Sequence, residues 1–198
     1  MGAPGSSTNA IGVLVNRQGR RQIGRCVALC LATTMVLASI APAAAWPEDD
    51  VKSAVVLSFL RYSEWPMSPA DSHLTIGVMG RSSMAVTLRR NLEGRAVNNR
   101  TVHVIELKPD FDPRCCQIVY LATNRESEIR PVLANSRSSP VLTLGETDRF
   151  LDCGGAVNLM VVDGHMAFEV DLITLAQSGV VISSRLLRYG QVRRRPRA

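Results

Sequence analysis

The stretch FEVDLITLAQSGVVISSRLLRYG, residues 168–190, is dense in apolar residues and changes its periodicity along its length. As far as Val170 it alternates apolar and polar residues, as the end of a half-buried strand does. From Asp171 onward the apolar residues recur at helical spacing, and Gly179 is placed to end that helix as a C-cap. The sequence therefore predicts a strand that leads directly into a helix, packs on the core and closes the domain.

Polar side chains are expected to cap this helix and a short one after it. Glu169 and Asp171 are two residues apart at the end of the strand, so they could face one way as a pair of carboxylates for acid–base chemistry. The interpretation that we prefer is that one of them caps the following helix. Ser183 or Ser184 can then cap the last helix, at residues 184–189.

Upstream of this stretch, strands alternate with helices. Apolar runs predict strands at residues 74–79, 101–107, 116–121 and 140–144. Helical spacing predicts helices at residues 51–62, 82–92 and 126–134. An Asp-Gly pair at 163–164 joins two further strands, 156–162 and 166–170, as a hairpin. This order predicts an α/β fold over residues 46–190: a single layered domain with a mostly parallel mixed sheet flanked by helices, a C-terminal hairpin and short terminal helices.

Residues 1–45 have the layout of a secretory signal peptide. Four arginines without an acid precede a short apolar run at residues 26–40, and three alanines at 43–45 provide a cleavage site of small residues. We expect cleavage after Ala45 and export of the mature chain. The alternative is an uncleaved membrane anchor, although the apolar run is short for a bilayer span.

The positive charge of the chain is concentrated at its two ends. The formal net charge is +6, but four arginines belong to the signal peptide and four more are Arg193, Arg194, Arg195 and Arg197. Residues 191–198 are expected to form a basic disordered tail, with contact to anionic lipid headgroups as the alternative. The part of the chain between the signal peptide and this tail is close to neutral in charge, which argues against a nucleic-acid partner.

The sequence carries no motif for catalysis or cofactor binding. It lacks a C-x-x-C pair, a G-x-S-x-G elbow, a G-x-G-x-x-G fingerprint and a P-loop lysine. His73, His103 and His165 share no metal-ligand spacing with one another or with the cysteines, and they are expected to be surface or turn residues. We therefore expect a protein that is not an enzyme and that has no catalytic, cofactor-binding or metal-binding residues.

Three cysteines remain after the signal peptide, so at least one thiol has no partner within the chain. Cys115 and Cys116 are neighbours, and a bond between neighbours needs a strained ring. If a disulfide forms, Cys153 is expected to pair with one of them, and Cys116 is the partner that we expect. The alternative is three free thiols, with Cys116 buried as a small apolar residue.

These segments together resemble the YfiR family of small periplasmic proteins of Gram-negative bacteria. The resemblance rests on motifs that occur in the same order over nearly all of residues 49–190. They are Glu64-Trp65-Pro66, the strand at 74–80, Leu92-Glu-Gly-Arg95, the Cys-led strand at 116–121, Pro140-Val-Leu-Thr-Leu144, the turn at 150–155 and the C-terminal signature at 168–189. The chain departs from the family at Asp171, where Asn is usual, and at Gly77 and Met160, where some members carry cysteine.

The resemblance implies a regulatory function. Members of the family bind the periplasmic domain of an inner-membrane diguanylate cyclase and repress it, which lowers cyclic di-GMP and biofilm formation. An outer-membrane lipoprotein can sequester the repressor, and a homodimer is a further possibility. The resemblance thus implies a periplasmic location with the signal peptide removed. The alternative function is a periplasmic small-molecule sensor or solute-binding protein.

A partner-binding surface is expected near the C-terminus. Arg185 and Arg188 are three residues apart, so they share a helical face and could pair with acids of a partner. A short helix near a chain end cannot bury every apolar side chain, so some of Val181, Ile182, Leu186 and Leu187 are expected to stay exposed beside these arginines, with Ile182 and Leu186 as the expected binding residues. The alternative is that these apolar residues all fill the core and both arginines are solvated. Trp65 is either an anchor for a partner or a lid on the core.

Overall fold

The computed structural model describes residues 47–66, 72–108 and 111–193. The predicted signal peptide lies outside the described residues. Among the described residues, no helix combines the length and the apolar character that crossing a membrane requires.

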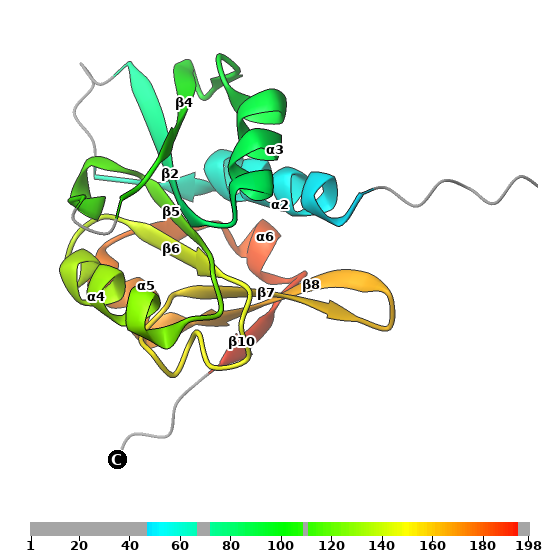
Figure 1. Ribbon diagram of the computed structural model, residues 1–198, viewed down its shortest axis with the longest axis vertical. Coiled ribbons are helices and arrows are strands. Elements are labelled where there is room, and N and C mark those ends of the chain that lie inside the picture. The colour runs from blue at the N-terminus through cyan, green and yellow to red at the C-terminus, as the bar shows by residue number, and fades with distance from the viewer. Residues whose placement is uncertain (1–46, 67–71, 109–110, 194–198) are drawn as a thin grey trace, which may run out of the picture. The chain divides into compact units, whose positions relative to one another are not determined.

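A mixed sheet with the strand order β10-β8-β7-β6-β5-β2-β4-β3 forms the centre of the described domain (Figure 1). Five neighbouring strands run parallel, β8 pairs antiparallel with β7, and β3 pairs antiparallel with β4. The strands are β2 (His73–Gly80), β3 (Ala96–Val97), β4 (Arg100–Glu106), β5 (Ile118–Ala122), β6 (Leu142–Gly145), β7 (Val157–Val162), β8 (His165–Asp171) and β10 (Gln191–Arg193). The predicted fold class is confirmed, including the hairpin, whose turn residues Asp163 and Gly164 both have positive φ as a type I′ turn requires.

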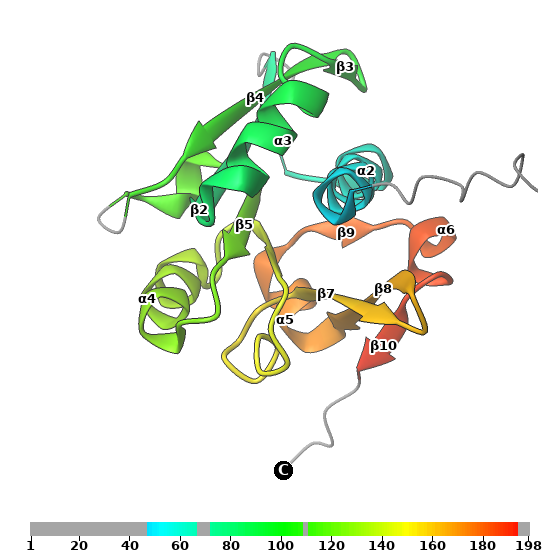
Figure 2. The ribbon, with the colours of Figure 1, turned by 45° about the vertical axis from the view of Figure 1, so that its right-hand side comes forward.

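Helices cover both faces of this sheet. The first face packs against α2 (Glu48–Tyr62), α3 (Ser82–Leu92) and α6 (Ser184–Leu187), and the second against α4 (Glu126–Ser136). Figure 2 shows α4 on one side of β5 and α2 and α3 on the other. A 3₁₀ helix, Pro113–Cys115, precedes β5, and α5 (Leu172–Ser178) follows β8.

The central strand β5 explains why the core has two parts. Ile118, Tyr120 and Ala122 belong to the cluster under α2 and α3, whereas Val119 and Leu121 belong to the cluster under α4. Successive side chains of a strand point to opposite faces, so a strand that is covered on both sides must be apolar throughout. Every residue of β5 is accordingly buried.

The end of the domain forms as its sequence predicts. Asp171 is the N-cap of α5, and its Oδ1 accepts hydrogen bonds from the backbone N–H groups of Ile173 and Thr174, each at 3.0 Å. Gly179 ends this helix with a φ of 72°. The Ser183 hydroxyl caps α6 by accepting from the backbone N–H of Arg185. These local caps confirm both ends of α5 and the start of α6, whereas α6 ends at Leu187, two residues before the predicted end.

Several very short strands were not predicted. β1 (Ser63–Glu64) pairs antiparallel with β9 (Val181–Ile182), and β10 pairs parallel with the end of β8. The strand β10 corrects the predicted disordered tail for Gln191–Arg193, and Arg193 also pairs with Asp152 at 2.9 Å. Two or three residues have no readable periodicity, so only the partner strand defines such pairings. Residues 194–198 lie outside the described residues.

Candidate partner-binding surface

The end of α2 and the short helix α6 lie side by side and enclose a shallow groove. The pairing of β1 with β9 joins the segments that follow α2 and precede α6. The backbone N–H of Ser183 also donates to the carbonyl oxygen of Tyr62 at 2.8 Å. The groove has a volume of about 460 Å³ and is lined by Ser58, Tyr62, Arg185, Leu186, Arg188 and Tyr189.

Large side chains stay exposed around this groove. Tyr189 is 73% exposed, Val181 is 61% exposed and Tyr62 is 45% exposed. Arg185 and Arg188 are exposed as well. We call these five residues the α2–α6 surface. Tyrosine and arginine are enriched among the residues that contribute most to protein–protein binding, so this composition suits a partner-binding site.

The two arginines of the α2–α6 surface have donors available for a partner. Among the described residues, neither guanidinium forms an ion pair with an acid. Arg188 donates from Nε to the carbonyl oxygen of Arg185 at 3.2 Å, and its guanidinium carbon lies 5.3 Å from the centroid of the Tyr189 ring. A planar guanidinium held in this way can still receive a carboxylate along its free edge.

The sequence-predicted binding residues do not all reach this surface. Arg185 and Arg188 do, but Ile182 is 6% exposed and Leu186 is 8% exposed, and both belong to the core cluster under α2. The expectation of exposure is therefore wrong for Ile182 and Leu186, whereas Val181, which belonged to the same expected patch, is exposed. The reason is that α6 packs onto α2, and β9 turns Ile182 inward where it turns Val181 outward.

Trp65 belongs to the core rather than to the α2–α6 surface. Its indole packs against the core cluster and its Nε1 donates to the carbonyl oxygen of Gln117 at 3.0 Å. Of the two expectations for this residue, the lid on the core is the one that the geometry supports. The sequence alone did not indicate Tyr62 and Tyr189 as binding residues, because the exposure of these side chains depends on how the two ends of the domain pack together.

The predicted disulfide between Cys153 and Cys116 is absent. Cys115, Cys116 and Cys153 are free thiols, and the Sγ atoms of Cys115 and Cys116 are 3.4 Å apart without a bond. Cys116 and Cys153 are buried in the cluster under α4, while Cys115 is exposed. Burial raises the pKa of the Cys116 thiol well above its usual value, and the neighbouring Cys115 adds to the effect. The alternative of three free thiols is the one that the structure has.

A second hollow lies where the parallel strands β2, β5 and β6 end. It measures about 640 Å³, and its lining includes Gly80, Ala122 and Glu146. The chain leaves β2 for β4 and then returns to β5 on the other side of β2. Open α/β sheets commonly bind ligands at such a switch point, outside the carboxyl ends of the strands.

Charged side chains form one wall of this second hollow. Lys52 is 5% exposed and makes ion pairs with Glu146 and with Glu48, the latter at 2.6 Å. Arg81 approaches the other carboxylate oxygen of Glu146 at 2.8 Å. Burial alone would lower the pKa of Lys52, but the hydrogen bonds to Glu146 and Glu48 outweigh it, so the pKa is raised. Lys52 is therefore a fully charged, paired group inside the protein.

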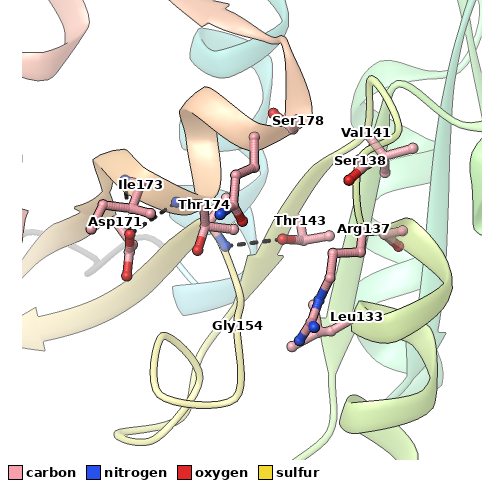
Figure 3. Close-up of a pocket in the computed structure, with 13 residues that line it drawn as sticks. Leu133, Arg137, Ser138, Val141, Thr143, Gly154, Asp171, Ile173, Thr174 and Ser178 are labelled. Carbon is pink, nitrogen blue, oxygen red and sulfur yellow. Dashed lines mark hydrogen bonds between the residues drawn. The ribbon is translucent and has the colours of Figure 1, made fainter. Parts of the chain in front are cut away.

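A third hollow lies at the opposite end of the sheet, beside the start of α5. It has a volume of about 450 Å³, and Figure 3 shows Thr143, Asp171 and Arg137 on its walls. The Thr143 hydroxyl accepts from the backbone N–H of Ala156 at 3.0 Å, and Asp171 caps α5 as described above. Thr143 and Asp171 thus stabilise the backbone around this hollow.

Comparison with a solved structure gives a distant likeness. The crystal structure of a conserved domain protein from Vibrio cholerae O1 biovar El Tor strain N16961 is similar at a TM-score of 0.46 and 10% sequence identity. The match covers 73% of this chain and 60% of that chain.

The sequence comparison is more specific. The model of the YfiR/HmsC-like family, DUF4154, matches residues 49–191. This range contains the whole described sheet from β2 to β8 and every helix described above apart from the first residue of α2. The chain belongs to the YfiR/HmsC-like family.

Proposed function

We propose that this chain is a periplasmic repressor that binds the periplasmic domain of an inner-membrane diguanylate cyclase through the α2–α6 surface. Membership of the YfiR/HmsC-like family supports a periplasmic regulator of such a cyclase and favours regulation over catalysis. Binding lowers cyclic di-GMP and with it biofilm formation. An outer-membrane lipoprotein would relieve repression by competing for the repressor.

The observation that carries the proposal is the exposure of two tyrosines beside two arginines. Tyr62 and Tyr189 offer large amphipathic rings, and Arg185 and Arg188 offer guanidinium groups without an acidic partner among the described residues. A partner that brings carboxylates and apolar side chains to this groove would bury the rings and pair the charges.

Charge reversal at the two arginines tests the surface. We expect the Arg185→Glu, Arg188→Glu double variant to keep its thermal stability, since both side chains are exposed. It should capture the purified periplasmic domain of the cyclase at least about tenfold more weakly, because charge pairing is replaced by repulsion at two positions. In cells that carry the variant, cyclic di-GMP should rise.

A matched control reverses two exposed arginines on the α4 side, Arg137→Glu with Arg149→Glu. This control should bind and repress as the parent does. If the α6 variant folds, binds and represses normally, the α2–α6 surface is not the interface. If deletion of the gene leaves cyclic di-GMP and surface attachment unchanged, the repressor function itself is wrong.

Export is the second part of the proposal. A basic, apolar and alanine-rich sequence at residues 17–45 supports removal of the signal peptide after Ala45. Intact-mass measurement of the protein from periplasmic extract should give a chain that begins at Trp46. A full-length chain retained in the cytoplasm would contradict it.

The hollow at the switch point favours a second candidate function, that of a small-molecule sensor. The Tyr120 side chain is fully buried, and its hydroxyl has no hydrogen-bond partner among the described residues. Tyr120 precedes Ala122, which lines the hollow, by two positions in β5, so the two side chains point to the same face of the sheet. Metabolites that protect the purified protein against heat, and fail to protect a Tyr120→Phe variant, would support a sensor.

A further inference from the structure

Two histidines far apart in the sequence meet on the sheet. His73 begins β2 and His103 lies in β4, where the parallel register places it opposite Thr75. The two residues are therefore diagonal neighbours on one face of the sheet. The Nδ1 atom of His73 is 3.1 Å from the Nε2 atom of His103, and the rings are inclined at 67° with centroids 4.7 Å apart.

A carboxylate fixes the orientation of the second histidine. Glu93 Oε1 lies 2.9 Å from His103 Nδ1, and Glu93 Oε2 accepts the backbone N–H of Val104 at 2.6 Å. Because the carboxylate of Glu93 accepts the Val104 N–H and also lies against His103 Nδ1, it favours the tautomer in which His103 carries its proton on Nδ1 and presents the lone pair of Nε2 to His73.

This is the arrangement of a metal-binding histidine with its supporting carboxylate. Histidines that bind a metal almost always donate their other ring N–H to a carboxylate, a carbonyl or water. Two nitrogen ligands at a Zn–N distance of about 2.05 Å are roughly 3.3 Å apart in a tetrahedral site and about 2.9 Å apart at a right angle. The observed separation of 3.1 Å lies between these values. Without an ion, the two nitrogens share a hydrogen bond in which His73 Nδ1–H donates to His103 Nε2, and a bound ion would take the place of that proton.

We propose that His73 and His103 form a surface site for a late first-row divalent metal ion, oriented by Glu93. Imidazole nitrogen suits Zn²⁺, Ni²⁺ and Cu²⁺. Among the described residues, no group of three His, Cys, Asp or Glu side chains converges to enclose an ion. The two imidazoles therefore supply two ligands and water completes the coordination. The His103 side chain is 43% exposed, so an ion can reach it from solvent.

Metal titration of the mature chain tests this site. The protein carries no polyhistidine tag, is treated with a chelator and then dialysed, and contains Cys115→Ser to remove the exposed thiol. Isothermal titration with Zn²⁺ and, separately, with Ni²⁺ should show one binding equivalent per chain. His73→Ala and His103→Ala should each abolish it. Glu93→Gln should weaken it by about 10- to 100-fold, because it removes the charged acceptor behind His103.

The matched control is His165→Ala, which removes an exposed histidine at the hairpin turn. This variant should still bind one metal ion per chain. Circular dichroism establishes that each variant is folded, and His73→Gln provides a milder change at the same position. The proposal is wrong if the parent binds neither ion, or if the folded His73 and His103 variants bind as tightly as the parent.

Discussion

The backbone N–H of Ser183 donates a hydrogen bond to the carbonyl oxygen of Tyr62, with 2.8 Å between nitrogen and oxygen. The two residues are more than a hundred positions apart in the sequence, yet this bond joins the end of α2 to the start of α6. It follows directly on the β1–β9 ladder, in which Ser63 is paired with Ile182. The α2–α6 surface exists because these two chain segments are held together.

The exposed rings of this surface give the first prediction. Tyr62→Ala with Tyr189→Ala should weaken binding of the cyclase's periplasmic domain by about 10- to 100-fold, since tyrosine is enriched among the few interface residues whose truncation costs about 2 kcal/mol or more. The free energy of unfolding should change by less than about 1 kcal/mol, because Tyr189 is largely exposed and Tyr62 is nearly half exposed. Biolayer interferometry and urea denaturation measure the two quantities. Val161→Ala with Val162→Ala, which removes exposed apolar groups from the hairpin, is the control and should bind normally.

The buried lysine gives the second prediction. Lys52→Met should lower the free energy of unfolding at pH 8 by about 1–3 kcal/mol, because Glu146 loses a charged partner but keeps Arg81. The folded-state pKa of Lys52 is raised, so its contribution is complete below the unfolded pKa of about 10.4 and declines as pH rises through the folded value. Urea denaturation of the parent and the variant from pH 8 to pH 11.5 should show that the difference between their free energies of unfolding becomes smaller as the pH rises. If this difference is the same at pH 8 and at pH 11.5, the assigned ion pair of Lys52 is wrong.

A glycine packed against an aromatic ring gives the third prediction. The buried ring of Phe150 lies between Gly145 and Gly155, and a Cβ atom at Gly155 would overlap with this ring. Gly155→Ala should therefore destabilise the protein by about 1–3 kcal/mol through overpacking. Adding Phe150→Leu should make the double variant more stable than the sum of the single effects predicts, because the smaller side chain leaves room. If the free-energy changes of the two single variants simply add in the double variant, as measured by thermal or urea unfolding, the contact between Gly155 and Phe150 is not the cause.

The thiols give the fourth prediction. A thiol reagent should react quickly with Cys115 in the folded mature protein and slowly with Cys116 and Cys153, which are buried. The raised pKa of Cys116 further lowers its thiolate fraction. Cys115→Ser should remove the fast phase. In denaturant without reductant, three thiols per mature chain should react, and a smaller number would restore the disulfide hypothesis.

The elements that sequence reasoning predicted are those whose signals are local. The alternation of strands and helices follows from apolar periodicity, and the ends of α5 and α6 follow from Asp171, Gly179 and Ser183, whose side chains or φ values act within a few residues. The parallel sheet follows in turn from the order of these elements. The family motifs, from Glu64-Trp65-Pro66 to the C-terminal signature, are likewise read from residues 49–190 without coordinates.

The candidate sites depended on tertiary structure. Ile182 and Leu186 fill the core because α6 packs on α2, and no local pattern distinguishes them from the exposed Val181. His73 and His103 are thirty positions apart and meet only through the register of two parallel strands. A contact between distant segments depends on how the whole sheet packs, which the spacing of residues along the chain does not encode.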